Sequence, residues 1–215
     1  MYGYLYPERS ANGRASIQAA LDGAAATGRG TVVLTGEWTV NGTLYMSDGV
    51  TLLFEGATLN KTEGDFPVIT NLNRTRPRGK TLFGTQRGLA IIGEGVIRGE
   101  VEFVNVQDFT VSGISFENTP CGVGLYYSTG GRLTGLKFKD TELCILAGAG
   151  TRNCILTDIS AEGEGESVRF SSVRVPGRVV NYFGPDVYNN IVRGLNASAE
   201  VTLVGEYCYD IAVIK

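Results

Sequence analysis

Apolar residues are grouped in short runs along most of the chain, and Gly, Asn and Asp separate these runs. The runs include TVVLTG, VTLLFEG, LAIIGEGVIRG, VEFVNV, FTVSGISFEN, RLTGLKFKD, CILTDISAEG, IVRGLNAS and VTLVGEYC. Their richness in Val, Ile, Leu, Phe and Thr predicts short β-strands after residue 30. One earlier segment differs, because in residues 16–26 Ile17, Leu21 and Ala24 share a face at helical spacing and Gly28 then acts as a stop. The pattern predicts a short N-terminal helix followed by strands.

The apolar runs recur at a nearly constant step. Val111, Leu133 and Ile155 hold the same place in three runs and are 22 residues apart. The series extends to Ile91, which lies 20 residues before Val111, to Val192, which follows Ile155 by 37, and to Ala212, 20 further on. Second strands lie between these anchors: VEFV (101–104), VGLYY (123–127), LCIL (143–146), VRFS (168–171) and VTLV (201–204).

A unit of 20–22 residues with about three short strands and no helix is typical of one coil of a parallel β-solenoid, in which stacked coils share one apolar interior. The Leu-x-x-Leu-x-Leu signature of leucine-rich repeats is absent, and a β-sandwich would not place its anchors at a fixed step. We therefore predict a single domain, residues 1–215, with a helical cap (10–28), regular coils (31–172), an irregular insertion (173–190) and last coils (191–215).

Composition excludes several functions. The chain of 215 residues has a formal net charge of −3 and no histidine, which rules out Ser-His and Cys-His nucleophile pairs and imidazole zinc sites. The pI near 5.1 and the lack of a basic run argue against nucleic acid as a partner. No apolar stretch reaches the ~20 residues of a membrane span. No signal peptide is visible, so the sequence as written predicts a cytoplasmic protein, or a secreted one if it has been trimmed.

Four cysteines, Cys121, Cys144, Cys154 and Cys208, lie in or beside apolar runs without CxxC spacing. Small apolar-like thiols in such places are predicted to be buried, with disulfides or a metal site as minor alternatives. Glycine accounts for 30 of the 215 residues, which fits a fold with many tight corners.

Three segments resemble the pectin-lyase-like right-handed parallel β-helices, and their rhythm is nearest to that of polygalacturonases. Residues 15–59 (ASIQAALDGAAATGRGTVVLTGEWTVNGTLYMSDGVTLLFEGATL) resemble that superfamily's cap helix and first coils, and IIGEGVIRG (91–99) and VSGISFENTPCGVGLYYSTGGRLTGLKF (111–138) resemble later coils. The resemblance implies a right-handed β-helix that acts on acidic, pectin-like polysaccharide. The polygalacturonase motifs Asn-Thr-Asp, Asp-Asp, Gly-His-Gly and Arg-Ile-Lys are absent, and DTELCIL (140–146) and GEGESVRFS (163–171) stand where the first two would fall.

The second strands supply the candidate catalytic residues. Aligning them places one outward-facing residue of each coil in a row: Glu102, Gly124, Cys144, Arg169 and Thr202. Glu142 and Glu166 fall near the strand entrances. Carboxylates on neighbouring coils would be ~5 Å apart, as retaining glycosidases require, and those two coils apart ~10 Å, nearly as inverting ones require. Glu142, Glu166, Arg169 and Glu102 are therefore the candidate catalytic residues.

Two other interpretations of this region stay open. By resemblance to β-helix pectate lyases, Glu162, Glu164 and Glu166 would hold Ca²⁺ against an anionic sugar while Arg169 acts as the base. No other cofactor and no permanent metal site is predicted. The plainer interpretation is a solvated acidic turn at 162–166, with Arg169 paired to a neighbouring Glu.

The candidate sugar-binding residues are Tyr126, Lys139 and Arg193, which offer an aromatic ring and two cations. The first functional hypothesis is thus a carbohydrate-active β-helix, hydrolase or lyase, whose partner is a polysaccharide or oligosaccharide. The alternative is a non-catalytic module, glycan-binding or structural, within a larger surface or phage tail protein. The apolar C-terminal strand DIAVI lacks a polar cap, which allows a homo-oligomer through an open last coil.

Overall fold

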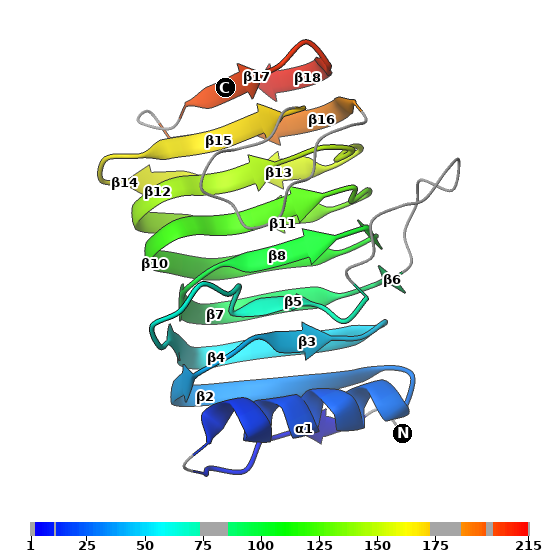
Figure 1. Ribbon diagram of the computed structural model, residues 1–215, viewed down its shortest axis with the longest axis vertical. Helices are drawn as coiled ribbons and strands as arrows, with labels where there is room; N and C mark the ends of the chain where they lie inside the picture. Colours follow the sequence, from blue (N-terminus) through cyan, green and yellow to red (C-terminus); the bar gives the residue numbers. More distant parts are fainter. Residues whose placement is uncertain (1–2, 11, 74–85, 173–185, 197–199, 215) are drawn as a thin grey trace.

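The computed structural model describes residues 3–10, 12–73, 86–172, 186–196 and 200–214. In this part of the chain, short parallel strands stack into a right-handed β-helix of about seven turns with one helix at its N-terminal end (Figure 1). The predicted all-β parallel solenoid is confirmed. Every strand ladder is parallel, because each coil follows the same path as the coil before it.

The first run of paired strands extends from one end of the molecule to the other. In spatial order it consists of β1 (Tyr4–Leu5), β2 (Gly30–Val40), β4 (Val50–Lys61), β7 (Ala90–Arg98), β10 (Thr110–Tyr126), β11 (Arg132–Thr134), β13 (Ile155–Thr157), β16 (Val187–Arg193) and β18 (Cys208–Ile214). β1 and β18 are therefore the two edge strands of this run.

A second run carries the candidate site. It consists of β3 (Leu44–Met46), β5 (Ile69–Asn71), β8 (Val101–Val104), the second half of β10, β12 (Lys137–Ala147), β15 (Glu166–Ser171) and β17 (Val201–Val204). β14 (Ser160–Glu162) pairs with the first half of β12, and β6 (Gln86–Arg87) pairs with β9 (Val106–Gln107). β10 and β12 thus pass from one face of the solenoid to another, which places their two halves in different surroundings.

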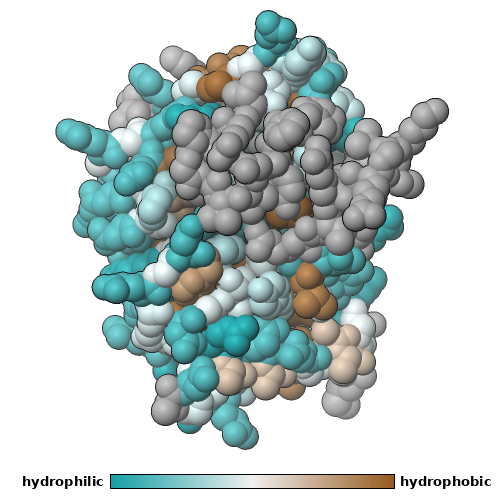
Figure 2. Space-filling view, in the orientation of Figure 1, coloured by the Kyte–Doolittle hydropathy of each residue, from teal (hydrophilic) through white to brown (hydrophobic). Residues whose placement is uncertain are grey.

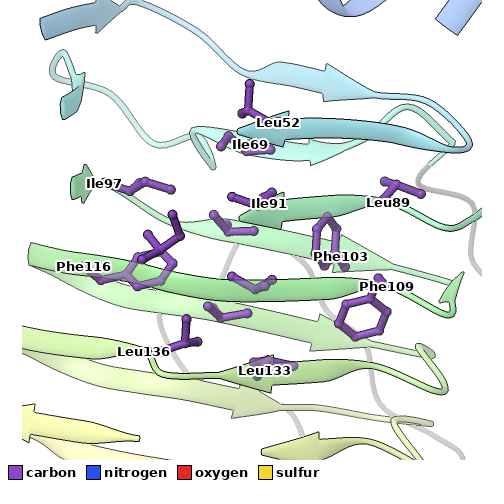
Figure 3. Packing of buried hydrophobic residues seen from close by; sticks show 14 of the residues in the cluster. Leu52, Ile69, Leu89, Ile91, Ile97, Phe103, Phe109, Phe116, Leu133 and Leu136 are labelled. Carbon is purple, nitrogen blue, oxygen red and sulfur yellow. The ribbon is translucent and has the colours of Figure 1, made fainter. Parts of the chain in front are cut away.

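Interior side chains form columns parallel to the solenoid axis. One column in strict register is Leu52, Ile91, Val111, Leu133, Leu156, Val192 and Val213. Figure 3 shows several of its members and the neighbouring phenylalanines pointing into the same interior. Phe116 and Phe138 stack with ring centroids 5.1 Å apart, so successive coils also make specific aromatic contacts.

The register corrects two predicted anchors. Leu133 pairs with Leu156, not with Ile155, and Val192 pairs with Val213, not with Ala212. Ile155 faces outward and is half-buried, whereas Leu156 is fully buried. Both neighbours are apolar in each case, so the sequence pattern alone could not tell which of them points inward.

Gly, Asn and Asp between the runs form the corners of the coils. At one corner, a residue with a left-handed backbone conformation recurs in five successive coils. These residues are Asp108 (φ 52°), Gly130 (69°), Asn153 (53°), Asn189 (53°) and Asp210 (52°). The residues just before them are in register with one another from Gln107 to Tyr209. These residue types tolerate the left-handed region best, which explains why they separate the apolar runs.

α1 (Gly13–Ala26) closes the N-terminal end of the solenoid and lies inside the predicted cap, 10–28. The side-chain oxygen of Asn12 accepts a hydrogen bond from the backbone N–H of Ala15 (3.1 Å), as a helix N-cap does. Ile17, Leu21 and Ala24 are buried against the first coil, which confirms the predicted apolar face.

The coil boundaries differ from the predicted ones. Leu52 pairs with Ile91, 39 residues later, so the region expected to contain only regular coils (31–172) includes one long step. Of the predicted insertion 173–190, residues 173–185 lie outside the described residues, and β16 already begins at Val187. Within the described residues, no helix combines the length and apolarity that a membrane span requires.

All four cysteines are free thiols. Cys121, Cys144 and Cys154 are buried as predicted, and Cys208 is half-buried near the C-terminal end. Burial raises the pKa of the Cys144 thiol to about 12. For Cys154, burial likewise raises the pKa to about 12, although a backbone hydrogen bond at Gly131 acts in the opposite direction.

Candidate functional site

The second run of strands carries one row of residues on the side away from the main interior, of which only Arg169 and Thr202 are not buried. Its membership differs from the predicted row at one position. In register the row reads Thr70, Glu102, Gly124, Leu146, Arg169 and Thr202. Leu146 takes the place predicted for Cys144, which packs in the interior cluster instead. The apolar stretch LCIL can be aligned with the repeat so that either Cys144 or Leu146 lies beside Gly124. The observed pairing of Val123 with Ile145 selects Leu146.

Glu102 belongs to this row, but its side chain is only 3% exposed. It lies three coils from Arg169, a separation of roughly 14 Å at the spacing of parallel strands. Glu102 also lies near the buried Cys121, whose pKa is raised first by burial and then by this carboxylate. The strand levels of Glu102 and Glu166 are therefore farther apart than the roughly 5–9.5 Å that separates the two carboxyl groups of a glycosidase.

Glu166 and Arg169 form the centre of the candidate site on β15. Arg169 Nη2 donates a hydrogen bond to Glu166 Oε2 within an i,i+3 ion pair, and the side chains are 29% and 19% exposed, respectively. Burial tends to raise the pKa of Glu166, but hydrogen bonds from Arg169 and Thr202 and the Arg169 charge outweigh it and leave the pKa below its usual value. Glu166 is thus an ionised acceptor, not a proton donor, near neutral pH.

This ion pair leaves hydrogen-bonding capacity unused. Glu166 Oε1 and Arg169 Nε are both buried, and neither has a hydrogen-bond partner among the described residues. Buried polar atoms without partners are uncommon in folded proteins, because each costs about 1–3 kcal/mol. The unused donor and acceptor are therefore buried atoms within a partly exposed ion pair, and a ligand reaches them only if these side chains move.

Glu142 and Lys139 lie on β12 but do not join this centre. Leu143, not Glu142, is in register with Glu166, and the Glu142 side chain is exposed. Lys139 is exposed on the first half of β12, between Glu117 and Glu162 on the adjacent strands. This alternation of charges suits cross-strand attraction, which gives Lys139 a structural role that needs no ligand.

The other predicted sugar-binding residues lie apart from one another. Tyr126 is 4% exposed and belongs to a small buried cluster outside the main interior, with Val104, Cys121, Tyr127, Leu143, Leu146 and Ala149. Arg193 is exposed on β16, in the first run, where it is in register with Thr157. The structure thus brings together Glu166 and Arg169 of the predicted set, with Thr202 beside them.

Thr202 is the member of this group to which the sequence assigned no role. It was placed in the outward row, but nothing in the sequence shows that its hydroxyl reaches Glu166, since the two residues are 36 positions apart. A signal was nevertheless available in the second strands, because the alignment of VRFS with VTLV already put Thr202 on the level next to Arg169.

The described residues contain no group of three or more His, Cys, Asp or Glu side chains placed to hold one metal ion. In the acidic turn, Glu162 and Glu164 are exposed, and Glu166 is bound to Arg169. A Ca²⁺ site at residues 162–166 stays a prediction.

Comparison with known proteins gives a likeness in structure but none in sequence. No family model and no curated protein matches the chain. Among solved structures, the tailspike protein of E. coli bacteriophage HK620 in complex with a pentasaccharide superposes with a TM-score of 0.64 at 15% identity, over 97% of this chain and 42% of that one. The shared feature is the fold.

Two further tailspike structures from the same phage agree. A double mutant gives a TM-score of 0.62 at 16% identity with the same coverage, and a mutant in complex with a hexasaccharide gives 0.57 at 14% identity, over 97% and 53% of the two chains. This chain therefore spans about half or less of the tailspike chains it resembles. Two of these tailspike structures contain an oligosaccharide, a pentasaccharide in one and a hexasaccharide in the other.

Proposed function

We propose that this chain binds an acidic, pectin-like polysaccharide on the outer face of the second run, with Arg169 as the residue that recognises a sugar carboxylate. The observation that carries the proposal is the Glu166–Arg169 pair, which is partly exposed and retains an unused donor at Arg169 Nε. Oligosaccharide complexes on tailspikes of the same fold support it.

The chemistry of the pair fits an anionic ligand. A guanidinium offers a planar fork of donors that matches a carboxylate in a bidentate arrangement. In the free protein Glu166 occupies one side of that fork, through Nη2, while the part of the chain that the structure describes offers no partner to Nε. Both Nε and Glu166 Oε1 are buried in the free protein, so an incoming sugar carboxylate would bond to Nε, and a sugar hydroxyl would donate to Oε1, once the two side chains turn outward.

Binding is better supported than hydrolysis. Hydrolysis requires two carboxyl groups that face one glycosidic bond, and Glu102, Glu142 and Glu166 do not occupy equivalent positions on coils at a suitable separation. Elimination with Ca²⁺ and Arg169 as the base remains the enzymatic alternative, because it needs neither a carboxylate pair nor a histidine.

A purely structural module of a phage tail or surface protein is the second candidate. It is favoured by the likeness in fold to tailspikes. On this hypothesis the Glu166–Arg169 pair only fixes β15 against β17, and no soluble glycan competes for it.

The test is isothermal titration calorimetry with oligogalacturonate and, for comparison, with the same oligomer fully methyl-esterified. The free acid is expected to bind and the ester to bind at least tenfold more weakly. Arg169→Gln should remove the preference, because a hydrogen bond to a charged group contributes about 1.5–3 kcal/mol. Arg132→Gln is the matched control, since it removes an exposed arginine from β11 in the first run.

Equal affinity of Arg169→Gln and the unchanged chain would contradict the assignment of the site, and absence of binding to a panel of acidic glycans would favour the structural module. The same samples, incubated with and without Ca²⁺, report on catalysis. Unsaturated products that absorb in the ultraviolet only with Ca²⁺ would indicate elimination, and new reducing ends without that absorbance would indicate hydrolysis.

A further inference from the structure

The sequence contains two Asn-Gly dipeptides, Asn12-Gly13 and Asn41-Gly42, and the structure places them in different surroundings. In this dipeptide the backbone nitrogen of the glycine can attack the side-chain amide of the asparagine, because glycine has no side chain that obstructs the approach. The attack requires a backbone that is free to turn and an asparagine side chain that no other contact holds. These two requirements separate the two sites.

Asn12-Gly13 is held in place at the start of α1. The side-chain oxygen of Asn12 accepts the N-cap hydrogen bond from Ala15 N (3.1 Å), and Gly13 is buried in the first turn of the helix. A Cβ at Gly13 would lie only 2.6 Å from Thr39 O, so the backbone there packs directly on β2. Attack on the Asn12 side chain would therefore require the first turn of α1 to open and its cap to be lost.

Asn41-Gly42 lies in the short connection between β2, which ends at Val40, and β3, which begins at Leu44. The last residue of β2 is fixed, because Val40 O accepts a hydrogen bond from Thr62 N (3.0 Å). Beyond it Asn41 is exposed, and no hydrogen bond among the described residues holds its side chain. Figure 2 shows hydrophilic residues over much of this N-terminal end of the molecule. The Asn41 amide is thus in contact with solvent and next to a glycine outside any strand.

Arg14 brings a positive charge from α1 to this connection. Its Nε donates a hydrogen bond to Thr43 O (3.1 Å). The side chain also lies against Gly42, where a Cβ would be 2.9 Å from Arg14 Nε, so position 42 has no room for a larger residue unless Arg14 moves. Among the described residues, no carboxylate forms an ion pair with Arg14. A guanidinium therefore lies beside the residue whose nitrogen has to lose its proton, and it favours that loss.

Acidic residues occur nearby but are placed differently. Asp22 is exposed on α1, eight residues after Arg14, which is about 12 Å along the helix axis. In the loop after β4, Glu63 and Asp65 are exposed, and Asp65 interacts with Lys61. Arg14 is thus the charged side chain that the described contacts place against the connection between β2 and β3.

We propose that Asn41 is a site of spontaneous deamidation and that Arg14 accelerates the reaction. Gly42 N loses its proton to solvent and forms a bond to Asn41 Cγ. The bond between Cγ and Nδ2 then breaks, and Nδ2 takes up a proton from water and leaves as ammonia. Water opens the resulting succinimide ring by adding its hydroxyl to one ring carbonyl and its hydrogen to the ring nitrogen. The product acid, aspartate or isoaspartate, releases one proton.

The charge that develops along this path is negative at each stage. The deprotonated nitrogen, the oxyanion of the tetrahedral intermediate and the product carboxylate all form beside the Arg14 guanidinium. A positive charge already in position stabilises such groups without rearrangement at the moment of reaction. Isoaspartate also adds one methylene group to the main chain between β2 and β3, so the modification changes the connection that Arg14 fastens to α1.

The experiment is peptide mapping by mass spectrometry after incubation of the 215-residue chain at mildly alkaline pH, with an unincubated sample as background. Trypsin separates the two sites, because Asn12 falls in the peptide of residues 10–14 and Asn41 in that of residues 30–61. In the folded chain Asn41 is expected to convert about tenfold faster than Asn12, or more. In urea the two rates should become similar, because both asparagines precede a glycine and neither is then held.

Variants of Arg14 test its part in the reaction. Arg14→Gln should slow the conversion of Asn41 severalfold in the folded chain and leave its rate in urea unchanged, whereas Arg14→Lys should retain most of the rate. Arg29→Gln is the matched control, since it removes an exposed arginine beyond the other end of α1. A merely structural role would give the opposite sign, because a loosened connection reaches the attacking geometry more easily. Circular dichroism melts establish that each variant is folded.

Three results would overturn the proposal. Equal conversion of Asn12 and Asn41 in the folded chain would show that the structure does not select the site. An Asn41 that converts in urea but stays intact in the folded chain would show that the connection protects it. A rate for folded Arg14→Gln equal to or above that of the unchanged chain would remove Arg14 from the reaction.

Discussion

The two ends of the solenoid meet the same physical requirement in different ways. At the N-terminal end, α1 lies across the first coils, and Ile17, Leu21 and Ala24 are buried there. The Gln18 amide also fastens the helix to β3, since it accepts a hydrogen bond from Tyr45 N (2.8 Å) and donates one to Tyr45 O (3.0 Å). At the C-terminal end, Leu203 and Val213 occupy interior columns and are about half exposed.

The contrast shows that a solenoid coil does not complete its own core. Each coil buries its interior side chains against its neighbours. Leu203 and Val213, in the last described coil, continue buried columns and are nevertheless exposed. The contribution of a residue to the stability of the protein therefore depends on the coil in which it lies as much as on its type. Four predictions break or sharpen this comparison, from the largest expected change in stability to the smallest.

The largest contrast is expected between two leucines at opposite ends. Leu21→Ala removes a buried side chain of the cap and should lower the free energy of unfolding by about 2–5 kcal/mol. Leu203→Ala removes the same atoms from a half-exposed position and should cost less than about 1 kcal/mol. Urea denaturation at a dilute, monomeric concentration measures both. Equal losses would mean that the C-terminal coil is covered as well as the cap is.

Two buried asparagines provide a second pair. Asn71 bonds to both Val104 N (2.8 Å) and Val104 O (2.9 Å) and also to Gln86, whereas Asn190 bonds to Cys154 N (2.9 Å) and Thr151 O (3.2 Å). Each backbone group left unsatisfied costs about 1–3 kcal/mol, so both alanine variants should be destabilised.

Asn71→Ala is expected to be the more costly of the two, because it removes the larger set of hydrogen bonds. Thermal denaturation followed by circular dichroism ranks the variants. A larger loss for Asn190→Ala would show that the coils near the open end limit the stability of the whole.

Acid should weaken the attachment of β15 to β17, the last two strands of the second run. The folded pKa of Glu166 lies below its usual 4.5, so the carboxylate contributes stability that is complete above pH 4.5 and is lost as the pH falls through the lower folded value. Glu166→Gln abolishes this part of the pH dependence. The measurement is the free energy of unfolding of both proteins between neutral pH and acid, and identical slopes would contradict the assigned pKa direction.

The reactivity of the thiols can distinguish the C-terminal end of the solenoid from the coils before it, and the measurement leaves the fold unchanged. Cys208 is half-buried on β18, whereas Cys144 and Cys154 are buried with pKa values raised to about 12. Ellman's reagent at mildly alkaline pH should therefore modify one thiol per chain quickly and the others only on unfolding. Cys208→Ala should remove the fast phase, and a fast phase that survives this substitution would place the accessible thiol elsewhere.

The sequence predicted the type of fold because its signals are local and repeated. Corner residues such as Asn153 and Asp158 recur where the chain needs a left-handed conformation, and the apolar run after each corner marks a strand. The exact register between the strands of successive coils was harder to predict. Ile155 and Leu156 are both apolar, and a slip by one residue exchanges the inner and the outer face of a strand.

The site was predictable only in part. Glu166 and Arg169 are three residues apart on one strand, so their pairing follows from local geometry, and the sequence indicated it as the plainer alternative. Glu102 looked equally suitable as an outward carboxylate, yet it is 3% exposed and three coils away from Arg169. Burial of an outward position depends on what covers the face, and the strand pattern contains no information on that.

The amino-acid sequence by itself determined the parallel β-helix, the cap helix and the chemistry that the chain excludes, because these depend on the spacing of apolar residues and on which side chains exist. The tertiary structure alone decided which residues share a level, that Thr202 reaches Glu166, and that the two ends of the solenoid differ. Those relations join residues far apart in the chain, and the register between coils, set by packing over the whole interior, brings them together.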